Sequence, residues 1–114
     1  MKIFLTGATG FVGSTVLNKL IKTNCNPVVV IRSIEEINPL VECVQFDSID
    51  SKTDWNNELV GSDVVIHCAA RVHVMNDEAS DPLSEFREVN TFGTLNLARQ
   101  AADSGIKRFI FIST

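Results

Sequence analysis

The chain has 114 residues, 45% of them hydrophobic and 21% charged, which is typical of one small globular domain and excludes a disordered segment. Its formal net charge of −4 argues against a nucleic-acid partner, which would need clustered basic residues. No apolar run is long enough to span a membrane, and three cysteines without a CxxC pair favour reduced thiols in the cytoplasm over a disulfide framework or a metal site.

The first half of the chain alternates apolar runs with amphipathic segments. Residues 2–6 predict a strand, and the segment after it predicts a helix that ends at residues 24–27. Residues 28–32 ("VVVIR") predict a second strand buried on both faces, and residues 42–46 a third. A short helix is expected over residues 53–59, capped near Thr53 or Asp54. The expected buried face of the first helix carries Val12, Val16, Leu17, Leu20 and Ile21.

The second half continues the alternation. Residues 62–70 ("SDVVIHCAA") predict a fourth strand, and residues 107–114 a fifth. A long helix lies between them, with Pro82 in its first turn and Gly105 at its end. Its expected inward positions are Leu83, Phe86, Val89, Leu97 and Ala101. The alternation predicts one α/β domain, residues 1–114, with a doubly wound parallel sheet of about five strands and helices on both faces.

The stretch "LTGATGFVG", residues 5–13, joins the first predicted strand to the first predicted helix. A helix start presents unpaired N–H groups and the positive end of the helix dipole, which together favour a diphosphate. Gly7 permits the tight turn, Gly10 lets the backbone approach the phosphates, and Gly13 lets helix and strand pack closely. The alternative is that the glycines serve only the sharp turn.

Four stretches, "LTGATGFVG", "DVVIHCAA", "VNTFGTLNL" and "KRFIFIST", occur in this order and together span the chain. With them the chain resembles the N-terminal part of an extended short-chain dehydrogenase/reductase of the nucleoside-diphosphate-sugar epimerase/dehydratase type. The resemblance implies a truncated Rossmann-like sheet, an NADP or NAD cofactor and a nucleotide-sugar substrate. The glycine signature, TGxxGxxG, implies that the dinucleotide is contacted by Thr6, Gly7, Gly10, Phe11, Val12 and Gly13.

The residue after the second strand bears on the choice of dinucleotide. An NAD site usually has an Asp or Glu there to accept from the ribose 2′-OH, but this chain has Arg32. Arginine has no acceptor and suits a 2′-phosphate, which favours NADP over NAD. In the alternative, Arg32 stacks on the adenine or points to solvent, and Glu35 or Glu36 serves the ribose.

The resemblance implies two further walls of the cofactor site. Asp47 would hydrogen-bond the adenine amino group, with Ser48 or Ile49 against the ring; otherwise Asp47 only starts a polar loop. Ala69 and Ala70 would line the dinucleotide, because small side chains leave the channel open.

Polar residues around the end of the fourth strand have simpler explanations than catalysis. His67 and Cys68 end a buried strand and are interpreted as core residues. Arg71 and His73 follow at the carboxyl edge of the sheet, where ligands of α/β folds bind. Either could contact a substrate phosphate or sugar hydroxyl, and Arg71 is also placed with the cofactor contacts. The alternative for both is a solvated loop.

Two positions match catalytic residues of the family. Asn90 matches an asparagine that supports a water relay beneath the active-site lysine, and Thr114, beside Ser113, matches the catalytic Ser/Thr. Asn and Gly inside a helix cost roughly 0.5–1 kcal/mol relative to Ala. Asn90 is therefore expected to make a polar contact and Gly93 a close packing contact, unless the helix bends there. The family's general acid/base, a tyrosine followed four residues later by a lysine, is missing, because the chain has no tyrosine.

We therefore expect the cofactor-binding fragment of a longer NAD(P)-dependent epimerase, dehydratase or reductase of nucleotide sugars, inactive on its own. Residues 107–113 would form an apolar edge strand that pairs with another chain, making a homo-oligomer. The alternatives are a non-catalytic module that senses NAD(P) and an NADPH-dependent reductase of small ketones or aldehydes.

Overall fold

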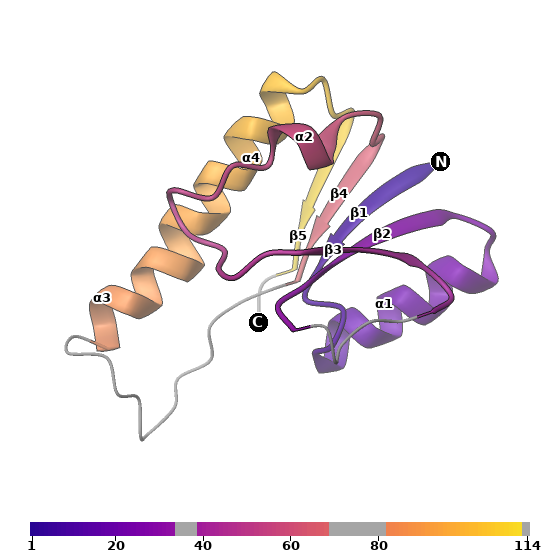
Figure 1. Ribbon diagram of the computed structural model, residues 1–114, viewed down its shortest axis with the longest axis horizontal. Coiled ribbons are helices and arrows are strands. Elements are labelled where there is room, and N and C mark those ends of the chain that lie inside the picture. The colour runs from indigo at the N-terminus through magenta and orange to yellow at the C-terminus, as the bar shows by residue number, and fades with distance from the viewer. Residues whose placement is uncertain (34–38, 69–81, 113–114) are drawn as a thin grey trace.

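Runs rich in β-branched and aromatic residues form the sheet at the centre of the molecule (Figure 1). The computed structural model describes residues 1–33, 39–68 and 82–112. Five parallel strands lie in the order β3-β2-β1-β4-β5. Their bounds are β1 Lys2–Thr6, β2 Asn26–Ile31, β3 Glu42–Gln45, β4 Val64–His67 and β5 Arg108–Phe111. The chain builds outward from β1 to one edge and then from β4 to the other, which confirms the predicted doubly wound α/β fold.

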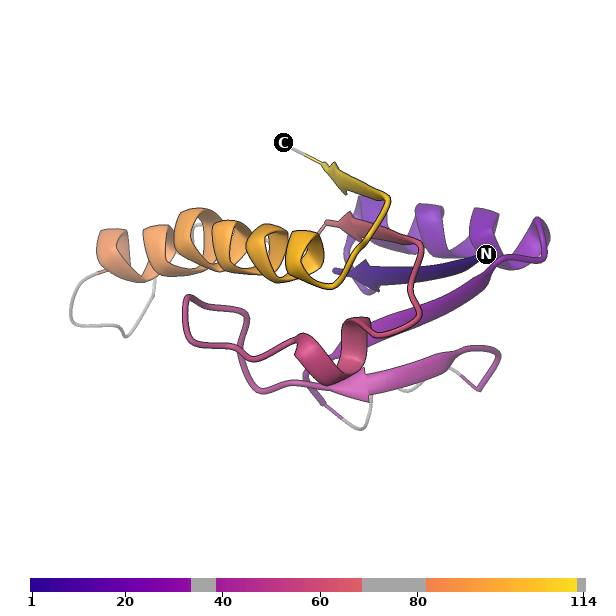
Figure 2. The same cartoon turned by 90° about the horizontal axis from the view of Figure 1, so that it is seen from above.

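Helices cover both faces of the sheet, as predicted. Helix α1 (Phe11–Lys22) lies on one face, and the short α2 (Asn56–Leu59) lies on the other with the long helical run (Figure 2). That run comprises α3 (Pro82–Arg87), the π-helical segment η2 (Glu88–Gly93) and α4 (Thr94–Asp103). The pleat divides the core accordingly. Leu5 and Val29 pack towards α1, while Phe4 and Val65 pack towards α4.

The sheet register brings two carboxyl strand ends together. Thr6, the last residue of β1, lies beside His67, the last residue of β4. The chain leaves β1 for α1 and leaves β4 for the long helical run on the opposite face. Ligands of open α/β sheets bind at such a switch point, because connections that diverge leave a crevice between them.

The long helical run agrees with the predicted span but is not uniform. The backbone widens into η2 where Asn90 and Gly93 stand, and a Cβ on Gly93 would lie 2.7 Å from the carbonyl oxygen of Ile49. The close packing expected at Gly93 is therefore confirmed. At the other end, Gly105 adopts a φ of 77°, and the amide of Ile106 donates to Ala101, which closes the helix as expected.

One predicted inward position of this run is wrong. Leu83 is 57% exposed, whereas Leu97 and Ala101 are buried as predicted and Val89 is half-buried. Bonding from i to i+5 turns the backbone less per residue, so over η2 the chain rotates about the helix axis by roughly a quarter turn less than an α-helix would. This difference places Leu83 away from the face that carries Leu97. The side chain of Phe86 lies outside the described part of the chain.

Two smaller differences have local causes. The helix expected from residue 53 begins only at Asn56. The side chains of Asn96 and Gln100 donate to the carbonyl of Thr53, which a helix starting there would use for its own first hydrogen bond. The carboxylate of Asp54 accepts the amide of Asn56, in keeping with its expected place near the cap. Val12, expected on the buried face of α1, is 39% exposed. It stands in the first turn of the helix, which begins at Phe11.

Cys25, Cys43 and Cys68 are half-buried free thiols. Within the described ranges, no helix is long and apolar enough to cross a bilayer.

Candidate functional site

The glycine loop forms a closed turn between β1 and α1. Gly7 adopts a φ of 76°, a conformation that strongly favours glycine, and its carbonyl accepts the amide of Gly10 at 3.1 Å. Gly10 caps the helix without a side chain, and the first helical bond runs from the amide of Ser14 to its carbonyl at 2.9 Å. Among the residues that the structure describes, the amides of Phe11, Val12 and Gly13 therefore have no backbone partner.

Gly10 and Gly13 are needed for different reasons. A Cβ on Gly13 would lie 1.8 Å from the carbonyl oxygen of Gly7, so this glycine lets α1 approach the loop. A Cβ on Gly10 would meet only the same oxygen, at an ordinary 3.4 Å. Packing thus explains Gly13, whereas the protein's own packing leaves room for a side chain at Gly10.

The open amides lie beside exposed apolar side chains. Phe11 is 91% exposed, and Val12 is also exposed, although both begin a helix whose later apolar residues pack on the sheet. These features together fit the diphosphate of a dinucleotide. The open amides can bind an anion, Gly10 leaves space beside them, and the exposed Phe11 and Val12 offer apolar contacts.

Thr6 supports this loop from below. Its side chain is fully buried, and its hydroxyl lies 2.6 Å from Nδ1 of His67 and accepts the amide of Cys68 at 3.2 Å. Nε2 of His67 in turn lies 3.0 Å from the hydroxyl of Thr94 on α4. Burial lowers the pKa of His67 to about 4, so the imidazole is neutral near pH 7. His67 is a core residue, as predicted, but one with two polar partners.

The second candidate region is the loop after β3. Asp47 and Ser48 are exposed, whereas Ile49 is buried in the core on the α4 face. The amide of Lys52, followed by the hydroxyls of Ser48 and Thr53, lowers the pKa of the Asp50 carboxyl and so favours the carboxylate that shapes the loop.

The long helical run holds this loop through its polar side chains. Glu88 accepts from the amide and the hydroxyl of Ser51. Nδ2 of Asn96 donates to the carbonyl of Asp50 at 3.1 Å and to that of Thr53 at 2.8 Å, where Nε2 of Gln100 donates as well. The sequence carries a signal for these contacts, because Asn96 and Gln100 stand four residues apart beside the inward Leu97 and Ala101.

Arg32 and Asn90 also lie in described segments. Arg32 directly follows β2 and is exposed, and its carbonyl accepts Nε2 of Gln45 at 3.3 Å. Because β1, β2 and β3 are parallel, Arg32 stands at the same edge as Gly7 and Asp47. Asn90 is half-buried within η2. The other candidates lie outside the described residues: Glu35, Glu36, Ala69, Ala70, Arg71, His73, Ser113 and Thr114.

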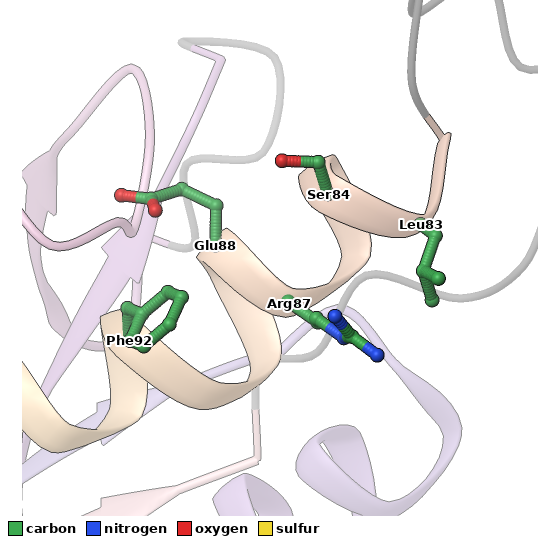
Figure 3. Close-up of a pocket in the computed structure, with 5 residues that line it drawn as sticks. All are labelled: Leu83, Ser84, Arg87, Glu88 and Phe92. Carbon is green, nitrogen blue, oxygen red and sulfur yellow. The ribbon is translucent and has the colours of Figure 1, made fainter.

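The surface of the long helical run and the acidic, histidine and cysteine side chains bear on two other kinds of site. A hollow along α3 and η2 is lined by Leu83, Ser84, Arg87, Glu88 and Phe92, with Leu83 and Arg87 on the opposite side of the helix from Ser84 and Glu88 (Figure 3). In the described part of the chain, no three His, Cys, Asp or Glu side chains cluster as a metal site would require.

Comparison with known proteins gives consistent matches along the chain. A family model described as "NAD dependent epimerase/dehydratase family" matches residues 3–114. The UDP-glucose 4-epimerase of Vibrio cholerae is 46% identical over 98% of this chain and 34% of that protein. The chain thus spans about a third of the length of that curated relative.

Solved structures agree with this match. The UDP-N-acetylglucosamine 4-epimerase of Bacillus cereus is 29% identical with a TM-score of 0.77, over 100% of this chain and 40% of that one. The UDP-glucose 4-epimerase of Thermotoga maritima, solved with UDP-glucose, is 27% identical with a TM-score of 0.78, over 100% of this chain and 38% of that one.

Proposed function

Because the chain belongs to the NAD-dependent epimerase/dehydratase family, we propose that its glycine loop binds the diphosphate of a nicotinamide dinucleotide in an enzyme that acts on nucleotide sugars. The observation that carries the proposal is the set of open amides at Phe11, Val12 and Gly13 beside the uncrowded Gly10. When bound, the cofactor supplies hydride transfer.

The remaining candidate contacts follow the strand ends around the loop. Arg32 binds the 2′-phosphate, which makes NADP the preferred cofactor. Asp47 accepts from the adenine amino group, and exposed Ser48 faces the ring, since Ile49 is packed in the core. Ala69, Ala70 and Arg71 are carried over from the family resemblance as further cofactor contacts.

Proton transfer needs groups beyond those that this chain offers. The 114 residues contain no tyrosine, so Asn90 and Thr114 would contribute to catalysis only beside a general acid/base supplied from elsewhere. The chain alone is then expected to bind the dinucleotide weakly and to show no turnover. We place the whole enzyme in the cytoplasm, in keeping with the free thiols. We propose a homo-oligomer because the edge strand β5 exposes Ile110 and Phe111.

Fluorescence titration of the 114-residue chain with NADH and NADPH tests the proposal, with far-UV circular dichroism as the check of folding. Arg32→Ser is expected to weaken NADPH binding about tenfold, the loss of a charge-assisted hydrogen bond, and to leave NADH binding within about twofold. A folded wild-type chain that binds neither dinucleotide would overturn the proposal. Equal loss for both dinucleotides would remove Arg32 from the 2′-phosphate site.

A second function that the open amides of the glycine loop would equally serve is a module that binds NAD(P) without turnover. A sensor must distinguish oxidised from reduced cofactor, so its affinities for NADP and NADPH would differ strongly. Competition between NADP and NADPH in the same titration gives the ratio of their affinities and so decides between the enzyme and the sensor.

A further inference from the structure

His67 joins three elements that meet under the glycine loop. It ends β4, its Nδ1 reaches Thr6 at the end of β1, and its Nε2 reaches Thr94 at the start of α4. Thr6 precedes Gly7 directly, and Thr94 follows Gly93, the last residue of the segment that contains Asn90. The imidazole thus links the strand that leads into the glycine loop to the long helical run through two polar contacts.

The chemistry of the ring gives its two hydrogen bonds opposite directions. A neutral imidazole has one N–H, so one nitrogen donates and the other accepts. One of the two threonine hydroxyls must therefore donate to the ring while the other accepts from it. Apolar packing helps to hold the ring in place, since Phe111 stacks on it with centroids 5.8 Å apart and Phe109 lies 6.4 Å away.

We propose that His67 is a positioning residue, whose bridge from Thr6 to Thr94 fixes the glycine loop against the helix that carries Asn90. A leucine would fill a similar volume, so a core role alone does not require two hydrogen bonds. The hydroxyl of Thr6 also accepts the amide of Cys68, so the bridge fixes the exit of β4 as well. The consequence for cofactor affinity rests on the function proposed above.

Thr94→Val is the sharpest perturbation, because it removes one hydroxyl at nearly constant volume. Hydrogen exchange of the Gly10 amide, which donates to Gly7, and of the Cys68 amide, which donates to Thr6, should become roughly fivefold faster, as the loss of one neutral hydrogen bond predicts. NADPH affinity should fall by a similar factor. Thr91→Val is the matched control, since Thr91 is exposed on the same helical run. It should change neither quantity.

Variants of His67 separate positioning from packing. His67→Leu should lose both loop protection and affinity, whereas His67→Gln, whose amide can donate and accept, should recover part of each. Nitrogen-15 spectra of the wild-type ring should show one protonated and one unprotonated nitrogen, with His73→Gln used to assign the signals. If His67→Leu does not fold, the exchange and affinity of Thr94→Val alone test whether His67 positions the loop.

Unchanged loop exchange in Thr94→Val, or a glutamine variant no better than the folded leucine variant, would overturn the bridge. Faster loop exchange in Thr94→Val together with no dinucleotide binding by the wild-type chain would support the bridge and overturn the proposed function. The two ideas can therefore fail separately.

Discussion

Substituting alanine at Gly13 tests whether this glycine is required by packing alone. The added Cβ would lie 1.8 Å from the carbonyl oxygen and 2.6 Å from the carbonyl carbon of Gly7. Both atoms belong to backbone, which cannot swing aside as a side chain does. The loop and α1 must therefore separate by more than about 1 Å, at the cost of their packing.

Two effects oppose each other at Gly13. Overpacking costs 1–3 kcal/mol or more, while alanine in a helix gains about 1 kcal/mol over glycine. Because the contact is backbone against backbone, we take the upper end of the cost and expect a net loss of about 2 kcal/mol in the free energy of unfolding. For a domain of this size that lowers Tm by roughly 10 °C, which calorimetry measures readily.

Gly10→Ala is the matched control from the same loop. Its Cβ would meet only the Gly7 oxygen at 3.4 Å, and its backbone at φ −77° and ψ 173° is open to any residue. Stability should stay within about 1 kcal/mol, the scale of a weaker helix cap. Affinity for NADPH should nevertheless fall more than about tenfold, because the methyl group occupies the space expected for the phosphates. An unchanged Tm in Gly13→Ala would refute the packing argument. Unchanged NADPH affinity in Gly10→Ala would show that the glycines serve only the turn.

Three further outcomes follow from buried polar groups and from the sheet edge. The pKa of His67, about 4 when folded against 6.5 when free, means that the unfolded chain binds the extra proton between these values, so acid destabilises the fold. The free energy of unfolding in urea should fall from pH 7 to pH 5 by about 2 kcal/mol more in the wild type than in His67→Gln. An equal fall in both proteins would contradict the lowered pKa of His67. Asn96→Leu leaves the carbonyl of Asp50 without its side-chain donor and should cost about 1–3 kcal/mol in urea unfolding; a neutral effect would mean that water replaces the amide. Strand β5 lies at the edge of the sheet with Ile110 and Phe111 exposed, so sedimentation should show concentration-dependent association that Ile110→Lys reduces; a wild type that stays monomeric at high concentration would count against pairing through β5.

The sequence was sufficient wherever a local rule decides the conformation. Alternating apolar runs placed all five strands, and glycine spacing placed the loop between β1 and α1. The end of α4 at Gly105 followed from the same kind of rule. The partners of His67 could not be predicted in this way, because Thr6 is 61 residues away and Thr94 is 27 residues away. The buried histidine was recognised as core, but its role depends on which strands become neighbours.

The π-helical segment shows how a tertiary contact overrides a helical period. Glu88 holds Ser51, Gly93 lies against the backbone of Ile49, and Asn96 reaches Asp50, so one face of the run follows the loop after β3. In a uniform α-helix, positions 88 and 93 would stand roughly 140° apart, too far for both to face one loop. Bonding from i to i+5 brings them closer and leaves Leu97 directed at the sheet. The widened turn therefore couples the loop that carries Asp47 to the helix that carries Asn90, and restoring a regular helix there would release one of these contacts.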